Sequence, residues 1–124
     1  MSFDAQITFL PVADLAASRL FYEEVLGLDV ATDQGSCVIF STGSGSYVGV
    51  CERDGASPAA GVIITLVSDD VDGWASSLGR AGVPIVSGPE HSDTYGIYHV
   101  FFRDPDGHLL EIQRFDDPHW ASGS

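Results

Sequence analysis

The stretch His99-Val-Phe-Phe-Arg-Asp-Pro-Asp-Gly-His-Leu-Leu-Glu-Ile112 decides the fold locally, because it holds two apolar strands joined by a tight turn. In Asp104-Pro105-Asp106-Gly107, proline presets φ at the second turn position and glycine accepts a left-handed conformation. The turn therefore predicts a three-residue hairpin loop with a glycine bulge, and this loop fixes which residues face each other across the two strands.

The predicted register gives the two faces of this hairpin different characters. Phe101 lies opposite Glu111, and His99 lies opposite Gln113, so these four side chains share one face. The other face should pack against helices because it is wholly apolar, with Val100, Phe102, Leu110 and Ile112. A carboxylate and an imidazole among aromatic side chains are typical of a small-molecule pocket.

Length and charge limit the classes of function. The 124 residues suit one compact domain over 1–124 that can bury a sizeable core. No apolar run approaches the ~20 residues of a membrane span, and no signal peptide is evident, so we expect a cytoplasmic protein without a membrane partner. The net charge of −13 excludes nucleic acid from the expected partners. The dispersed acidic side chains indicate a solvated surface or, alternatively, a field that attracts cationic ligands.

Two cysteines flank the segment Thr42-Gly-Ser-Gly-Ser46 symmetrically. A hairpin centred on this segment would place Cys37 opposite Cys51, so a disulfide is geometrically allowed. In a reducing cytosol, however, we expect two free thiols that act as small apolar side chains. Neither cysteine has metal-ligand spacing.

An internal repeat organises the chain into two modules. Ile7–Asp14 corresponds to Val62–Asp69, and each copy predicts a strand, a capping acid, an amphipathic helix, a glycine stop, a short strand and a hairpin. The modules span about 5–53 and 61–115, and the segment 54–61, rich in Gly, Ala and Pro, connects them.

Two segments carry a family resemblance. The run VADLAASRLFYEEVLG over Val12–Gly27, within residues 3–30, and FFRDPDGHLLE over Phe101–Glu111 resemble the vicinal oxygen chelate superfamily of glyoxalases, bleomycin-resistance proteins and extradiol dioxygenases. The resemblance covers nearly the whole chain. It implies an α+β fold of two βαβββ modules, with mixed sheets curled around a cavity that a homodimer commonly completes.

The resemblance also identifies the positions at which metal-using members hold their ion. Ile7 and Val62 occupy the first-strand positions, and both are hydrocarbons. Glu111 matches the ligand glutamate of the last strand, whereas its counterpart in the first module is Val50 or Gly49, depending on the register. A catalytic divalent metal normally takes three or more protein ligands, so we expect no cofactor.

A rearranged metal site is the alternative to a site without a metal. His99 and Glu111 lie on neighbouring strands and face the same way, and histidine is the commonest metal ligand. Glu52 is the only further candidate, and the side of its strand depends on the register.

Other polar and aromatic residues indicate less specific roles. His91-Ser92-Asp93 holds the residue types of a hydrolytic triad, but neighbours in sequence do not converge as a triad requires, so we expect a polar loop. His108, just after the turn, should be exposed. Tyr95 either stacks on a ligand or covers the core. For Trp120 we consider two alternatives: it folds over the pocket or a partner subunit, or it belongs to a disordered terminus.

Together these observations predict a metal-free small-molecule binding protein that acts by sequestration, with antibiotics among the candidate ligands, as in the drug-binding members that the chain resembles. We expect Glu111 to accept a cationic or hydrogen-bond-donating group. The predicted pocket walls are Phe9, Phe40, Tyr95, His99 and Phe101. The alternative is an enzyme: a lyase or dioxygenase with an atypical metal site, or an acid–base catalyst in which Glu111 and His99 transfer a proton.

Overall fold

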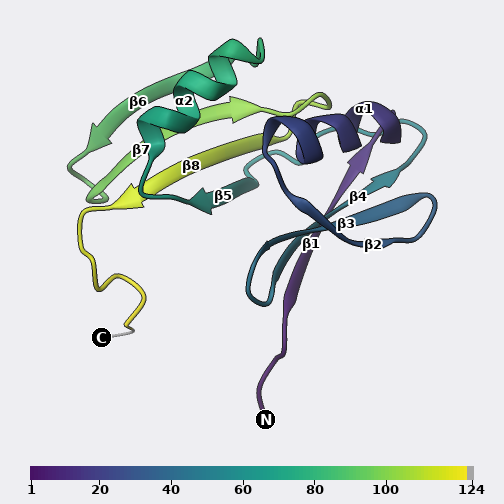
Figure 1. Cartoon of the computed structure of the whole chain (residues 1–124), viewed down its shortest axis with the longest axis horizontal. Helices are drawn as coiled ribbons and strands as arrows, with labels where there is room; N and C mark the ends of the chain where they lie inside the picture. The colour runs from purple at the N-terminus through teal and green to yellow at the C-terminus, as the bar shows by residue number, and fades with distance from the viewer. Residues whose placement is uncertain (123–124) are drawn as a thin grey trace. The chain divides into compact units, whose positions relative to one another are not determined.

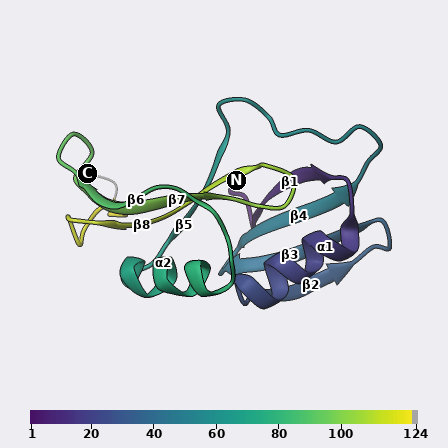
Figure 2. The same ribbon diagram turned by 90° about the horizontal axis from the view of Figure 1, so that it is seen from above.

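The structure, a computed structural model, describes residues 1–122 and consists of two compact units (Figure 1). Unit 1 contains Met1–Gly61 and the short segment Asp104–His108. Unit 2 contains Val62–Arg103 and the chain from Leu109 onward. Each unit has a four-stranded mixed sheet with a helical segment against one face (Figure 2). This is the α+β architecture of paired βαβββ modules that the sequence predicted. Within residues 1–122, no helix is long and apolar enough to cross a membrane.

In unit 1 the sheet has the strand order β1-β4-β3-β2, with β1 parallel to β4 and the other pairs antiparallel. Its strands are β1 (Gln6–Val12), β2 (Asp29–Asp33), β3 (Cys37–Gly43) and β4 (Ser46–Glu52). Between β1 and β2 the chain forms the helix α1 (Leu15–Leu20) and then the π-helix η1 (Phe21–Val25). Asp14 caps α1 by accepting a hydrogen bond from the Ala17 N–H at 3.2 Å.

The core of unit 1 lies between these helical turns and one face of the sheet. Tyr22 is fully buried, and its ring stacks on Phe40 with the ring centroids 5.5 Å apart. Phe40 is therefore a core residue with no exposed surface, although we expected it to form a pocket wall. The alternation of side chains along β3 turns Phe40 toward the helix, together with the buried Val38.

The turn Asp104–His108 belongs to unit 1 and is held there by buried hydrogen bonds. The Asp104 carboxylate accepts from the Tyr22 hydroxyl at 2.8 Å and from the N–H groups of Asp106 at 3.0 Å and His108 at 2.9 Å. The imidazole of His108 donates to the Pro11 carbonyl at 2.7 Å and is buried, so the expectation that it would be exposed was wrong. Local turn chemistry predicts the turn itself but not the surface on which it packs.

In unit 2 the strand order is β5-β8-β7-β6, with β5 parallel to β8. Its elements are β5 (Ile63–Val67), α2 (Val71–Arg80), β6 (Ile85–Ser92), β7 (Ile97–Arg103) and β8 (Leu109–Phe115). The predicted hairpin register is confirmed, because Phe101 pairs with Glu111 and His99 with Gln113. Gly107 has the left-handed φ of 87° that the turn requires.

The two modules correspond with a shift of one residue from the predicted alignment. The helix of unit 2 is capped by Asp70, which accepts from the Gly73 N–H at 3.0 Å, and not by Asp69. Ile63, rather than Val62, therefore stands in the place of Ile7. Two adjacent carboxylates precede this helix, and a sequence pattern alone does not tell which of them reaches the first turn.

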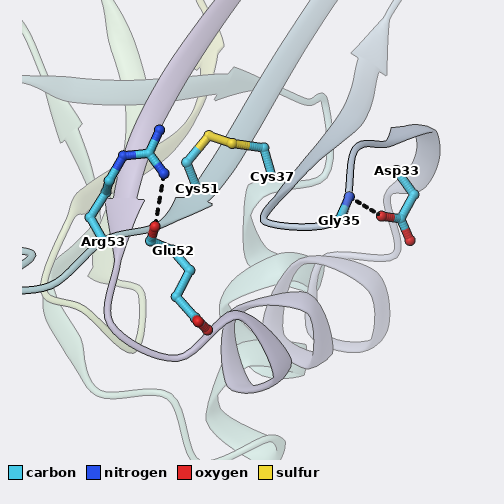
Figure 3. Close-up of a disulfide and its surroundings, with 6 residues drawn as sticks. All are labelled: Asp33, Gly35, Cys37, Cys51, Glu52 and Arg53. Carbon is cyan, nitrogen blue, oxygen red and sulfur yellow. Dashed lines mark hydrogen bonds between the residues drawn. A yellow bond between two sulfur atoms is a disulfide. The ribbon is translucent and has the colours of Figure 1, made fainter.

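Cys37 and Cys51 lie directly opposite each other on β3 and β4, as predicted, and they form a disulfide (Figure 3). The expectation of free thiols was wrong. It depended on an assumed reducing compartment, whereas the hairpin register brings the two side chains together regardless of compartment. Beside the bridge, Arg53 donates to the carbonyl of Glu52 at 2.8 Å.

Candidate functional site

A pocket of about 420 Å³ lies on the face of the unit 2 sheet that carries His99 and Glu111. The other face of β7 and β8 is the apolar core, where Val100 and Phe102 are fully buried. The volume falls within the range of small-molecule sites. The lining residues are Ile63, Tyr95, Ile97, His99, Phe101, Glu111, Gln113 and Phe115. Four of the six predicted site residues are therefore brought together in one pocket.

The polar centre of this pocket is a contact between an imidazole and a carboxylate. His99 Nδ1 lies 2.6 Å from Glu111 Oε2, and the two side chains are only 12% and 8% exposed. The carboxylate oxygen accepts, so Nδ1 carries the proton and the tautomer of the neutral imidazole is fixed. His99 Nε2 makes no hydrogen bond to residues 1–122, so it is available to a molecule in the pocket.

Glu111 has further protein partners at both carboxylate oxygens. The Thr65 hydroxyl donates to Oε1 at 2.9 Å, from the strand that lies parallel to β8. With the Gln113 amide turned so that its nitrogen faces the carboxylate, this nitrogen lies 3.0 Å from Oε2 and 3.2 Å from Oε1. Glu111 is thus held by Thr65, His99 and Gln113, and its main structural effect is to orient the imidazole.

Aromatic side chains form much of the remaining pocket wall. The Phe101 ring meets the His99 ring edge-on, with centroids 4.9 Å apart. Tyr95 lies in the turn between β6 and β7 and is 76% exposed, so most of its ring faces solvent and little of it covers a core. Phe115 ends β8 at the same pocket.

Phe9 belongs to unit 1, where it lines a separate depression of about 460 Å³ with Pro11, the disulfide and Arg53. Its ring lies over Gly49, since a Cβ on this glycine would be 2.5 Å from the ring. In unit 1 Gly49 pairs with Phe9. In unit 2 Glu111 pairs with Thr65, which occupies the place of Phe9. Of the two alternatives, the counterpart of Glu111 is therefore Gly49 and not Val50.

The side chains at the metal positions implied by the family resemblance do not fit a divalent cation. Ile7 and Ile63 have no donor atom, Gly49 is covered by a phenyl ring, and the oxygens of Glu111 have protein donors. Glu52, the further candidate ligand, accepts from the first N–H of α1 at 2.9 Å. In the part of the chain that the structure describes, no group of three or more His, Cys, Asp or Glu side chains is arranged so that it could hold a metal ion. Such a donor set falls short of the three protein ligands of a typical metal centre.

Two polar residues of the site were not among the predicted ones. Gln113 could have been selected, because the predicted register already placed it beside His99 on the pocket face. Thr65 could not, because its contact with Glu111 depends on the parallel pairing of β5 with β8, which no local pattern encodes.

Comparison with known proteins identifies the family of this fold. Residues 5–112 match the family model described as the Glyoxalase/Bleomycin resistance protein/Dioxygenase superfamily. The virulence protein STM3117 of Salmonella typhimurium is 28% identical over 118 residues, which cover 86% of this chain and 80% of that protein.

Solved structures with the same fold include proteins described in different functional terms. TnmS3, an antibiotic binding protein from Streptomyces sp. CB03234, is 24% identical with a TM-score of 0.75, covering 92% of this chain and 96% of its own. Lactoylglutathione lyase from Agrobacterium tumefaciens is 23% identical with a TM-score of 0.74, covering 94% of this chain and 95% of its own. At this identity the likeness shows the fold alone. The match over residues 5–112 shows that the chain belongs to the glyoxalase/bleomycin resistance protein/dioxygenase superfamily.

Proposed function

We propose that the protein binds a small planar aromatic molecule in the unit 2 pocket and sequesters it without changing it chemically. The observation that carries this proposal is the arrangement around Glu111. Protein donors occupy both carboxylate oxygens, so a ligand meets His99 Nε2 and the aromatic walls instead. Glu111 then acts as a positioning residue for His99, and not as the direct acceptor that the sequence suggested.

Charge and shape support a particular class of ligand. In the tautomer with the proton on Nδ1, the His99 ring presents an acceptor at Nε2, which favours a ligand with an N–H or O–H group. Phe101 and Phe115 offer surfaces on which a flat ring system can stack. The net charge of −13 raises the local concentration of cations. A planar cation with an N–H donor therefore satisfies all three features, and antibiotics of this chemistry are candidate ligands, consistent with the description of TnmS3.

Two probes test the proposal by isothermal titration calorimetry. Proflavine is planar, cationic at neutral pH and carries N–H donors, and 2-naphthol is planar and neutral with one O–H donor. Replacing Phe101 with Ala should weaken both probes by roughly 1 to 3 kcal/mol, or about 5- to 150-fold, through lost stacking and burial. The matched control is Phe3→Ala, which removes a phenylalanine that is 99% exposed in unit 1.

The variant His99→Gln tests the contribution of the His99 imidazole to binding separately from that of the aromatic pocket walls. Gln keeps a carbonyl acceptor but lacks the imidazole ring that Glu111 orients, so this change should weaken proflavine and 2-naphthol while Phe3→Ala leaves both affinities unchanged. Equal affinities of both probes for the parent protein, Phe101→Ala and His99→Gln would refute the assignment of this pocket. Failure of both probes to bind the parent protein would refute the proposed ligand class.

A second candidate function is proton transfer, and the 2.6 Å contact between His99 and Glu111 favours it. A carboxylate behind an imidazole with an accessible Nε2 is an arrangement suited to general acid–base catalysis. The test is solvent deuterium exchange at the α-carbon of hydroxyacetone, followed by NMR. An acid–base catalyst should accelerate the exchange, and His99→Gln should abolish the acceleration. A rate equal to that without protein would exclude this activity on that substrate and favour the binding function.

A further inference from the structure

The segment after β8 lies against the pocket wall of unit 2. The ring of Trp120 stacks on Phe115 with centroids 4.2 Å apart and an interplanar angle of 15°. Phe115 itself lines the pocket. The segment folds into short turns, in which Trp120 N–H donates to the Asp117 carbonyl at 3.2 Å and Ser122 N–H donates to the His119 carbonyl at 3.0 Å. Trp120 remains 50% exposed, so it has surface left for a further contact.

The same segment is hydrogen-bonded to the end of β6 and to the turn that carries Tyr95, which also lines the pocket. His91, at the end of β6, lies between two carboxylates: Nε2 is 2.6 Å from Asp116 Oδ2, and Nδ1 is 3.0 Å from Asp93 Oδ1. The Asp116 N–H also donates to the Gly96 carbonyl at 2.9 Å. His91 was expected in a polar loop, but it is in a strand and bridges two segments.

We propose that residues 116–122 form a pH-controlled strap at the rim of the unit 2 pocket, docked through His91 and adding Trp120 to the aromatic wall. The role of Trp120 toward a bound molecule rests on the proposed function. The docking of the strap does not, because it depends only on contacts within unit 2.

Both nitrogens of His91 face carboxylates, and this arrangement determines the direction of the pH effect. The hydrogen bond to Asp116 is the largest cause that raises the pKa of His91, and the charges of Asp116 and Asp93 add to it. Across the strand pair, His91 lies opposite Tyr98. The Tyr98 hydroxyl donates a hydrogen bond to Asp72, and the Arg114 guanidinium lies over the Tyr98 ring, 5.0 Å from its centroid.

Protonated His91 donates to both carboxylates, whereas the neutral ring has one donor and one acceptor. Deprotonation of His91 therefore leaves either Asp93 or Asp116 facing the lone pair of an imidazole nitrogen. The stabilisation of the strap should be complete below the ordinary histidine pKa and should be lost as the pH rises through the raised pKa of His91.

Collisional quenching of Trp120 by acrylamide measures whether the strap is docked. The chain has two tryptophans, so Trp74→Phe leaves Trp120 as the only emitter. Between about pH 5.5 and 9, the quenching constant should rise at least about twofold, with a midpoint above the ordinary histidine value. His91→Gln should give the high-pH quenching constant at every pH. The matched control is His119→Gln, which removes the histidine inside the strap and should keep the transition.

A second readout protects the test against a folding defect in Trp74→Phe. Labelling the otherwise unaltered protein with 5-fluorotryptophan gives separate ¹⁹F resonances for Trp74 and Trp120, and only the latter should shift over this pH range. A transition that persists in His91→Gln, disappears in His119→Gln, or does not occur in the parent protein would overturn the strap.

The contribution of Trp120 to binding is tested separately with proflavine. Trp120→Ala should weaken proflavine several-fold at pH 6 and have little effect at pH 9, where the strap is already released. Equal effects of Trp120→Ala at the two pH values would overturn the role of Trp120 as a pocket wall. If proflavine does not bind the parent protein at all, the proposed ligand class fails, while the quenching and ¹⁹F measurements still decide whether the strap exists.

Discussion

The hydrogen bond between Tyr22 and Asp104 gives a quantitative test of how the turn Asp104–His108 is held in unit 1. Tyr22 is fully buried, and its hydroxyl donates to Asp104 Oδ2 at 2.8 Å. Tyr22→Phe keeps the ring and its stacking on Phe40 but removes this donor. The cost should be about 1 kcal/mol if the Asp104 carboxyl is protonated in the folded protein and about 1.5 to 3 kcal/mol if it is ionised.

The assay is urea unfolding followed by circular dichroism, with the free energy of unfolding extrapolated to water. The matched control is Tyr47→Phe in β4 of the same unit. The Tyr47 hydroxyl makes no hydrogen bond to residues 1–122, so its loss should change stability by less than about 0.5 kcal/mol. Equal stabilities of the Tyr22→Phe and Tyr47→Phe variants would refute the view that this buried hydrogen bond anchors the turn.

Three further predictions concern stability and assembly. Burial raises the pKa of Asp104 in the folded protein. The parent protein should therefore lose stability relative to the Asp104→Asn variant as the pH rises from about 4 through that raised pKa. Stability–pH curves of the two proteins that run parallel would contradict this prediction. Replacing Cys37 and Cys51 together by Ala should lower the free energy of unfolding by about 3 kcal/mol, because the disulfide closes a loop between residues 14 apart in sequence. An unchanged urea midpoint would argue against the disulfide. The exposed apolar side chains of β1 and β5 favour a two-fold homodimer, which light scattering should detect at micromolar concentration and which a monomer mass would disprove.

The parts of the fold that sequence predicts well are those that local chemistry determines. The turn Asp104–Gly107 needs a proline and a left-handed glycine at fixed offsets, so it fixes the β7–β8 register and brings His99 and Phe101 to the face of Glu111. The symmetric spacing of the two cysteines about their hairpin likewise places them opposite each other.

The parts that sequence reasoning missed depend on contacts between distant segments. His108 is buried because the turn packs on unit 1, and Glu111 is occupied because β5 runs parallel to β8 and brings Thr65 beside it. The position of Phe40 depends on which alternate residues of β3 face the helix. The turn after β3 is less specific in sequence than the turn before β8, so it does not predict this alternation. The choice of Asp70 over Asp69 as helix cap depends on a difference of one residue that only the folded backbone resolves.

We propose that a ligand in the unit 2 pocket is anchored by His99 Nε2. The most direct measurement is a titration of ¹⁵N-histidine-labelled protein with proflavine, with the four histidines assigned by single substitution to Gln. The His99 Nε2 resonance should shift with the saturation curve of binding, while Nδ1, held by Glu111, should change little. Saturable binding of proflavine that leaves the resonances of His99 unchanged would show that His99 does not anchor the ligand.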